Sequence, residues 1–330
     1  MRPSPRALLA HAGVDALLVT DLVNIRYLTG CDLSAGFVLV TPRAFLLLTD
    51  ARYLEGAQQT AKANVAVRDQ ADMTKAMSRI PACGFEEDVV TVARYRGWRR
   101  SFAGTKFLRT SGAVESFRRQ KDEEELRAIR RAHRMTEELL RRVPSALRKG
   151  TTERGLAWKL RVWAQELGAD GLAFSPIVAF GSHTSRPHHL PTSRALQKGH
   201  MVQIDVGAVY GGYCADRSQV FFTTEPTPQQ EKAYRAVREA KDAVIAACVP
   251  GASTRALDQL ARSVLKKDGM DAAFCHALGH GVGLEVHEGV TLSSRQPDSK
   301  LLAREVVAVE PGVYFPGKFG IRLEDMVMVS

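Results

Sequence analysis

Three of the nine histidines lie within thirteen residues, in the stretch HALGHGVGLEVHE that runs from residue 276 to residue 288. They are His276, His280 and His287, and glycines flank the middle one on both sides. Because histidine is sparse elsewhere in the chain, this clustering indicates either a metal or proton-transfer site or a glycine-rich surface loop. The HExxH pattern of zinc peptidases is excluded, because no second histidine follows His287 at the required spacing.

Four carboxylates interrupt apolar, strand-like runs in the second half of the chain. Asp205 ends the run VQI, and Asp216 lies eleven residues later, beyond a glycine pair that predicts a hairpin turn. Such a hairpin would bring both aspartates to one site. Glu310 in VVAVEPG and Glu324 in GIRLEDMVMV lie within two further apolar runs. A buried ionised carboxylate is costly unless it is paired or bound to a cation.

Four such carboxylates, together with the histidine-glycine cluster, favour a shared cation. Oxygen ligands with a single imidazole suit Mn²⁺, Co²⁺, Fe²⁺ or Zn²⁺, and this set is larger than one catalytic zinc ion requires. It fits two ions, which in dinuclear sites lie about 3.5–4 Å apart and polarise a substrate oxygen together. Taken singly, each carboxylate can also be a turn, edge or strand-ending residue. The hypothesis therefore depends on their combination.

The elements that would position these residues form two domains. In the first, strand-like runs alternate with helical stretches, which is typical of an α/β unit. Strands are expected over 15–20, over 36–50 as two strands joined at 41–43, over 65–69 and over 82–88, with a helix over 51–63.

The composition shifts after residue 116, and we place the domain boundary there. The first domain then comprises residues 1–116 and the second residues 117–330. A long amphipathic helix is predicted over 117–142, and two capped helices over 152–167 and 227–247. The rest of the second domain is strand-rich, so that we predict an α+β fold with carboxylates embedded in its strands.

Bulk properties exclude several classes of protein. A length of 330 residues suits two domains. The net charge is +10, but basic and acidic residues alternate, which is more typical of a solvated helix face than of a nucleic-acid site. No apolar run approaches the roughly 18 residues that cross a bilayer, and the N-terminus does not resemble a secretory signal. We expect a cytoplasmic protein without nucleic-acid or membrane partners, whose five scattered cysteines are free, buried thiols.

The ordered set of motifs resembles the M24 metallopeptidases, the pita-bread enzymes, and among them the Xaa-Pro peptidases, aminopeptidase P and prolidase. In the second half the resemblance rests on IDVGAVYGGYCADRS, HALGHGVGLEVHE, VEPGVY and GIRLEDMV. In the first half NIRYLTG and TDARYLEGA are similar to the creatinase-type domain, and FRRQKDEEELRAIRRA is similar to the family's domain-joining helix. The resemblance implies a creatinase-like α/β N-terminal domain followed by a pita-bread catalytic domain.

The resemblance also implies a ligand set for two divalent metal ions, with Mn²⁺ or Co²⁺ favoured and Zn²⁺ as the alternative. Asp205 would bind one ion. Asp216 and Glu324 would bridge both ions. His280 and Glu310 would complete the second site.

Further residues match the family's catalytic positions. His287 would contact the substrate and support the tetrahedral intermediate. Glu310 would help to deprotonate the attacking water. His188, in RPHHLPT, would assist proton transfer and substrate binding, and its neighbour His189 is a rival for that role.

Two residues would support the ligands without binding metal. His276 belongs to the same glycine-rich motif. Arg322 precedes Glu324 by two positions, so that on a strand both side chains would point the same way and the guanidinium would orient the carboxylates. The glycines that flank His280 would let the backbone pass close to the ions.

The implied activity is metal-assisted hydrolysis of the bond between an N-terminal residue and a penultimate proline. Many dipeptidase-type members carry an arginine shortly after the histidine of the His-Glu motif, where it holds the carboxylate of the dipeptide. Here that position is Thr291, and the nearest arginine is Arg295. This favours an Xaa-Pro aminopeptidase acting on proline-containing peptides, with an Xaa-Pro dipeptidase (prolidase) as the alternative.

Other hypotheses fit less well. A non-catalytic pita-bread binding protein is favoured by the net charge but disfavoured by the complete ligand set. Methionine aminopeptidases usually lack such a first domain, and creatinase lacks the metal ligands. The family implies a homodimer or higher homo-oligomer. Relatives usually continue through a further strand beyond the position of Glu324, whereas this sequence ends at Ser330; any truncation would remove an edge partner but no matched ligand.

Overall fold

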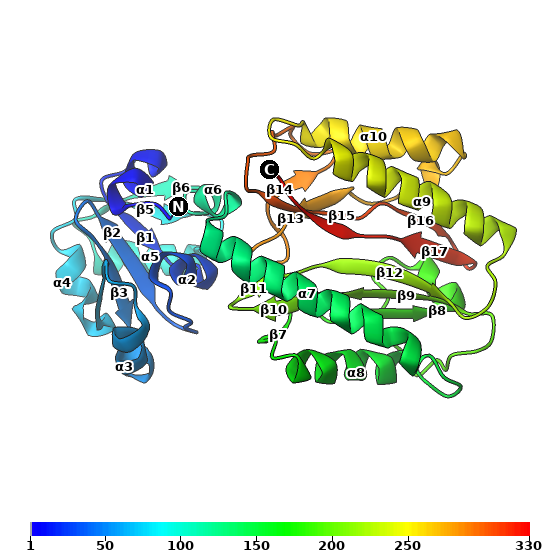
Figure 1. Cartoon of the computed structure of the whole chain (residues 1–330). Coiled ribbons are helices and arrows are strands. Elements are labelled where there is room, and N and C mark those ends of the chain that lie inside the picture. The colour runs from blue at the N-terminus through cyan, green and yellow to red at the C-terminus, as the bar shows by residue number, and fades with distance from the viewer. Residues whose placement is uncertain (1) are drawn as a thin grey trace. The chain divides into compact units, whose positions relative to one another are not determined.

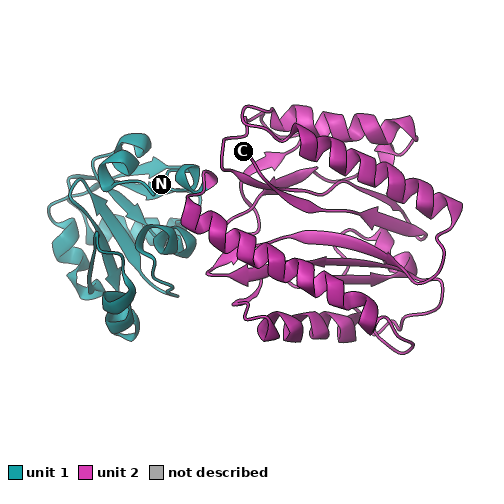
Figure 2. Ribbon diagram, viewed as in Figure 1, with its two compact units in different colours: residues 1–118 teal, residues 119–330 magenta. Residues whose placement is uncertain are grey.

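The computed structural model describes residues 2–330 and divides into two compact units, Met1–Arg118 and Arg119–Ser330 (Figure 2). Each unit has its own buried apolar core. The predicted order, an α/β domain followed by a mixed domain with several sheets, is confirmed. Within residues 2–330, no helix combines the length and the apolar character that a membrane span requires.

The first unit is built on one six-stranded sheet with the order β4-β3-β2-β1-β5-β6. Strands β1, β2 and β3 pair antiparallel, whereas β4, β5 and β6 join in parallel. The strands are β1 Leu17–Val19, β2 Phe37–Thr41, β3 Ala44–Thr49, β4 Val65–Asp69, β5 Ala82–Glu86 and β6 Lys106–Thr110. The helices are α1 Pro5–Ala12, α2 Leu22–Thr29, α3 Ala51–Thr60, α4 Met73–Met77, α5 Val92–Ser101 and α6 Glu115–Arg119.

The second unit consists of two halves, each with a pair of helices packed against strands (Figure 1). The first half comprises α7 Glu123–Ala146, α8 Glu153–Glu166, β7 Gly171–Leu172, β8 Ile177–Phe180, β9 Met201–Val206, β10 Ala208–Tyr210, β11 Tyr213–Cys214 and β12 Arg217–Phe222. The second comprises α9 Pro228–Ala247, α10 Thr254–Lys267, β13 Gly279–Gly281, β14 Glu288–Leu292, β15 Val306–Val309, β16 Gly312–Phe315, β17 Phe319–Arg322 and β18 Asp325–Met328.

The long helix predicted over 117–142 begins later than expected, at Glu123. Asp122 caps it by accepting hydrogen bonds from backbone N–H groups, and Glu125 returns a side-chain bond to the backbone of Asp122. This capping box fixes the helix start, because it satisfies N–H groups that have no partner within the first turn. Residues 117–119 belong to the separate helix α6, and residues 120–122 lie between the two helices. The predicted helices over 152–167 and 227–247 correspond to α8 and α9.

The predicted hairpin between the two aspartates is present. Strands β10 and β11 pair antiparallel around Gly211 and Gly212, whose φ angles are 59° and 80°. Positive φ at both central residues is the conformation that a two-residue hairpin turn requires and that glycine adopts without strain. Beyond this turn, β12 pairs with β9 so that Ser218 lies opposite Asp205.

The two larger apolar clusters of the second unit lie beneath its two pairs of helices. In the first half, the buried face of α7 and α8 packs against β8 and β9. In the second half, α9 and α10 cover β15, β16 and β17. All five cysteines are free thiols; four are buried, as predicted, whereas Cys275 is exposed.

Candidate metal centre

The five predicted ligands line one cavity of about 560 Å³ in the second unit. Each comes from the centre or the end of a strand. Asp205 lies in β9, Asp216 precedes β12, His280 lies in β13, Glu310 directly follows β15, and Glu324 joins β17 to β18. Strands from both halves therefore position carboxylates around one cavity, as the sequence predicts.

The distances between these side chains are longer than hydrogen bonds. His280 Nε2 lies 3.6 Å from Asp216 Oδ2 and 3.7 Å from Glu310 Oε1. Asp216, His280 and Glu324 each offer a ligand atom, and these three atoms lie within 4.8 Å of one another. Two atoms that bind the same ion at about 2.0–2.2 Å can be separated by up to about 4.4 Å. The spacing is therefore close to that of ligands around a shared cation.

Three carboxylate oxygens in this cluster are buried without a hydrogen-bond partner among the described residues. They are Oδ1 of Asp205, Oδ1 of Asp216 and Oε1 of Glu324. A buried acceptor without a partner is rare in native proteins and calls for an unseen water or ion. A divalent cation would satisfy all three. The oxygen-rich set with one imidazole thus fits Mn²⁺, Co²⁺ or Zn²⁺.

The raised pKa values of the clustered carboxyl groups also favour a bound cation. Burial, and then the neighbouring carboxylates, raise the pKa values of Asp216 and Glu324 well above their ordinary range. Burial and the Asp205 carboxylate raise the pKa of Glu310 to about 8, although Arg322 acts against them. Because like charges repel at this separation, the carboxyl groups do not all ionise at once. Cations at the site would relieve that repulsion.

Arg322 is the buried cation that the structure places beside the cluster. It is 3% exposed, and its guanidinium donates to a carboxylate oxygen of Asp205. It also donates to the Ser218 hydroxyl at 3.0 Å, the Tyr314 hydroxyl at 3.0 Å and the Pro187 carbonyl at 3.1 Å. The fork of the guanidinium therefore fixes three strands and one loop around the carboxylates.

His276 contacts this network through Tyr314, a residue that the sequence analysis did not single out. The Tyr314 hydroxyl accepts from Arg322, so its own proton is donated to His276 Nε2 at 2.9 Å. The other ring nitrogen then donates to the Ala277 carbonyl at 2.8 Å. Burial and the charge of Arg322 lower the pKa of His276 to about 4, which agrees with this neutral tautomer.

The remaining predicted histidines lie around the same cavity. The ring centroids of His287 and His280 are 4.1 Å apart. Burial, together with the nearby His188 imidazole, lowers the pKa of His287. His188 and His189 both line the cavity, but His189 also donates from Nε2 to Glu153 at 2.9 Å. Of these two neighbouring histidines, only His189 binds Glu153.

The backbone around His287 is held by a buried ion pair. Lys121 Nζ lies 2.9 Å from Oε1 of Glu288, and the two side chains are 2% and 5% exposed. The sequence analysis did not find this pair, because a lysine before a helix and a glutamate after a histidine are both ordinary surface residues. The pair closes a contact between positions 167 residues apart.

The glycines that flank His280 make close contacts with strands. A Cβ atom on Gly279 would lie 1.9 Å from the Ala308 carbonyl oxygen, and one on Gly281 would lie 2.2 Å from the Glu288 carbonyl oxygen. The sequence analysis attributed these glycines to a close approach between backbone and metal. The structure shows that they allow a close approach between β13 and its two neighbours in the sheet.

Comparison with known proteins shows to which family this chain belongs. The model of "Metallopeptidase family M24" matches residues 127–330, and that of "Creatinase/Prolidase N-terminal domain" matches residues 4–120. The chain belongs to metallopeptidase family M24. The resemblance stated from the motifs is therefore confirmed, as is the predicted pairing of a creatinase-type domain with a pita-bread catalytic domain.

Solved structures similar to this M24 peptidase span nearly its whole length. An Xaa-Pro dipeptidase from Bacillus anthracis is 29% identical, with a TM-score of 0.93 and coverage of 99% of this chain and 93% of that one. An X-Pro aminopeptidase from Thermotoga maritima is 32% identical, with a TM-score of 0.90 and coverage of 98% and 94%. An Xaa-Pro dipeptidase from Pyrococcus horikoshii is 28% identical over 319 residues, which is 96% of this chain and 90% of the relative.

Proposed function

We propose that this M24 peptidase is an Xaa-Pro dipeptidase that hydrolyses free dipeptides with a C-terminal proline. The observation that carries the proposal is the similarity to proteins named Xaa-Pro dipeptidase over almost the entire chain, at a TM-score of 0.93 for one of them. A cavity of about 560 Å³, within the usual size range of small-ligand sites, supports a small substrate.

The metal ligands belong to this proposal. Asp205, Asp216, His280, Glu310 and Glu324 would hold two divalent ions, for which Mn²⁺ or Co²⁺ is favoured by the oxygen-rich donor set. When bound, such ions act as Lewis acids that polarise the scissile carbonyl, and they lower the pKa of water so that hydroxide is available near neutral pH. The partnerless oxygens of Asp205, Asp216 and Glu324 support this assignment.

The side chains of the protein have separate tasks. Glu310 accepts the proton of the attacking water, and its position 3.7 Å from His280 places it within the ligand cluster. His287 donates a hydrogen bond to the oxyanion that develops on the substrate carbonyl. His188 supplies the proton that the leaving proline nitrogen needs, because a tertiary amide has no N–H of its own. Asp205 attracts the free α-amine of the dipeptide.

An Xaa-Pro aminopeptidase remains the second candidate, and two observations favour it. Thr291 lines the cavity at the position where the resemblance expects a carboxylate-binding arginine in dipeptidases. The Thermotoga maritima aminopeptidase is also 32% identical to this chain. In a dipeptidase, the substrate carboxylate must then be bound by a donor other than an arginine at this position.

The experiment compares chain length directly. Turnover of Ala-Pro and of Ala-Pro-Ala-Ala is measured with the Mn²⁺-loaded protein, and we expect kcat/KM at least about tenfold higher for the dipeptide, which corresponds to about 1.4 kcal/mol of binding to the terminal carboxylate. Faster cleavage of the tetrapeptide would establish the aminopeptidase instead.

Two controls identify the chemistry. Ala-Ala, which lacks proline, should be cleaved far more slowly than Ala-Pro. Asp216→Asn should abolish turnover of every peptide, because it removes a predicted bridging ligand. A wild-type protein that binds neither Mn²⁺ nor Co²⁺ and cleaves no peptide would favour the non-catalytic binding protein.

A further inference from the structure

A single buried carboxylate, that of Glu153, holds both ends of the segment 181–192, which carries His188. Glu153 is the first residue of α8 and is completely buried. Its Oε1 accepts from the backbone N–H of Phe180 at 2.9 Å, where the segment begins. Its Oε2 accepts from the backbone N–H of Thr192 at 2.9 Å and from the Thr192 hydroxyl at 2.6 Å, where the segment ends.

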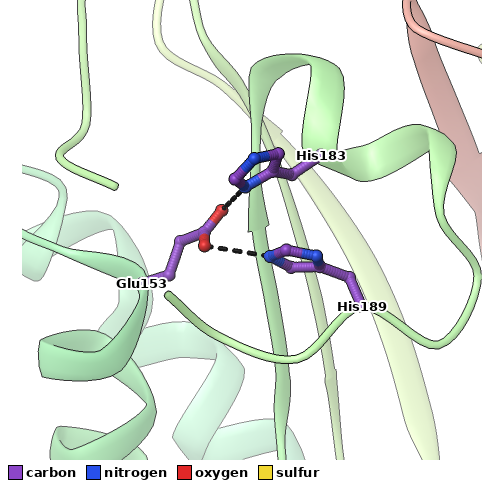
Figure 3. A group of neighbouring side chains, drawn as sticks. All are labelled: Glu153, His183 and His189. Carbon is purple, nitrogen blue, oxygen red and sulfur yellow. Dashed lines mark hydrogen bonds and ion pairs between the residues drawn. The ribbon is translucent and has the colours of Figure 1, made fainter. Parts of the chain in front are cut away.

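Two histidines within the segment bind the same carboxylate. His183 Nδ1 lies 2.8 Å from Oε1 of Glu153, and His189 Nε2 lies 2.9 Å from Oε2. The two rings are tilted against each other with centroids 4.4 Å apart (Figure 3). Because an ionised carboxylate can only accept, both imidazoles donate to it, which fixes the proton-bearing nitrogen of each ring.

The three side chains could in principle hold a cation, because their ligand atoms lie within 4.8 Å of one another. The hydrogen bonds argue for a different role. A carboxylate offers about four lone-pair positions, and this one already accepts five hydrogen bonds. Burial alone would raise the pKa of Glu153, but the bonds from His189, Thr192 and Phe180 lower it to about 2. An ion would have to displace both imidazoles.

The opposite side of the segment is tied to the candidate metal centre. Arg322, which binds Asp205, donates to the carbonyl of Pro187 at 3.1 Å. His188 therefore lies between a residue held by Arg322 and His189, which is held by Glu153. In addition, Gly320 in β17 donates its N–H to the Thr184 hydroxyl at 3.0 Å.

We propose that Glu153 is a positioning residue for the peptidase reaction, which fixes His188 in the cavity by anchoring the 181–192 segment at both ends. The proposal rests on the proposed function and on the role of His188 in it. Glu153 itself touches no reacting atom. It acts by holding the segment against α8, while Arg322 holds it against the carboxylates. A side chain misplaced by about 1 Å can lower a rate about 100-fold.

A double-mutant cycle tests this coupling. Glu153→Gln keeps the shape of the side chain but turns an N–H group toward the N–H donors at one end of the segment. We expect kcat for Ala-Pro to fall by about 10–100-fold, with KM changing less. In a His188→Ala background the same substitution should cost less than about twofold further, because the residue through which it acts is already gone. Additive losses in kcat would overturn the proposal.

Hydrogen exchange gives a readout that does not depend on activity. In the Mn²⁺-loaded protein, Glu153→Gln should speed amide exchange across 181–192, including the N–H group of Thr192, and at the N–H group of Phe180. Glu166→Gln, the same change at the other end of α8, where the carboxylate binds Arg142, is the control and should leave this segment unchanged. If wild-type protein cleaves no Xaa-Pro peptide but the exchange difference is present, the proposed function fails and the anchoring stands. Unchanged exchange in Glu153→Gln would overturn the anchoring.

Two further measurements cover the remaining outcomes. If Glu153→Gln does not fold, His183→Ala is used instead, because it removes one donor from a partly exposed position and leaves the backbone bonds intact; it should show a smaller loss of kcat in the same cycle. Metal content is measured on wild type and on His183→Ala. A third equivalent of Zn²⁺ or Mn²⁺ that disappears in the variant would identify a metal site and overturn the proposal.

Discussion

The guanidinium of Arg322 binds one carboxylate oxygen of Asp205, whereas the other oxygen of that carboxylate is buried without a partner. One oxygen is thus fixed by the protein and the other is left for an ion. With this division, Arg322 would support the proposed ligand without competing for the oxygen that would bind the ion.

Replacing this arginine should destabilise the metal-free protein strongly. Arg322→Met removes the charge that faces Asp205 and Glu310, and we expect the free energy of unfolding to fall by at least about 3 kcal/mol, since breaking a buried ion pair leaves uncompensated charge. Arg141→Met is the control, because Arg141 binds Glu138 from an exposed position on α7 and should cost less. Equal losses in urea unfolding of the two variants would contradict this account.

Removal of one bridging carboxylate should lower the metal content. Asp216→Asn should reduce the bound Mn²⁺ from about two equivalents to one or none, as measured by elemental analysis after gel filtration. Asp258→Asn is a suitable control, because that aspartate is also buried with one partnerless oxygen but lies beside Arg262 instead of the other carboxylates. Retention of two ions by Asp216→Asn would remove this residue from the ligand set.

The raised pKa values predict an unusual dependence of stability on pH in the metal-free protein. Glu310, with a pKa of about 8 when folded, keeps a proton that the unfolded chain has already lost, so stability falls as pH rises. His276 and His280, whose pKa values are lowered to about 4, act in the opposite sense only below their unfolded pKa of about 6.5. From pH 7 to pH 8 we therefore expect a loss of about 1 kcal/mol.

Thermal melts of the metal-free protein across this pH range test whether stability falls as pH rises. Glu310→Gln should flatten the slope, because the substituted side chain does not titrate. Saturating Mn²⁺ should reverse the slope, since metal binding displaces the protons and becomes tighter at higher pH. A Tm that rises with pH in the metal-free wild type would show that the cluster is not protonated as described.

The sequence predicts that the five candidate ligands lie together, and the structure brings them to one cavity; carboxylates within apolar strands are conspicuous. The hairpin that joins the two aspartates is equally predictable, since a glycine pair between two strand-like runs is typical of a two-residue turn. Tyr314 and Glu153 could not be found in this way. A tyrosine in an apolar strand and a glutamate in the first turn of a helix are ordinary there, and their importance arises only when Arg322 and the 181–192 segment pack against them.

Helix boundaries show the same limit. The sequence predicts a helix from residue 117, but the structure ends α6 at Arg119 and starts α7 at Glu123, because the Asp122 capping box competes with continuous helix. Helix α10, Thr254–Lys267, was not predicted, although Ser253 caps it. Its buried residues Leu257, Ala261 and Leu265 recur at helical spacing, so that this helix was predictable from the sequence.

The glycine before the predicted imidazole ligand gives the last prediction. Gly279→Ala would place a Cβ atom 1.9 Å from the Ala308 carbonyl oxygen. Because that oxygen is backbone of the adjacent strand, β13 and β15 would have to separate, and we expect the free energy of unfolding to fall by at least about 3 kcal/mol. Gly171→Ala, also in a strand, meets no atom within 4 Å and should change stability by less than about 1 kcal/mol. Because His280 lies next to Gly279, a folded Gly279→Ala protein should also bind Mn²⁺ more weakly. Wild-type stability and metal content in Gly279→Ala would show that the two strands tolerate the displacement.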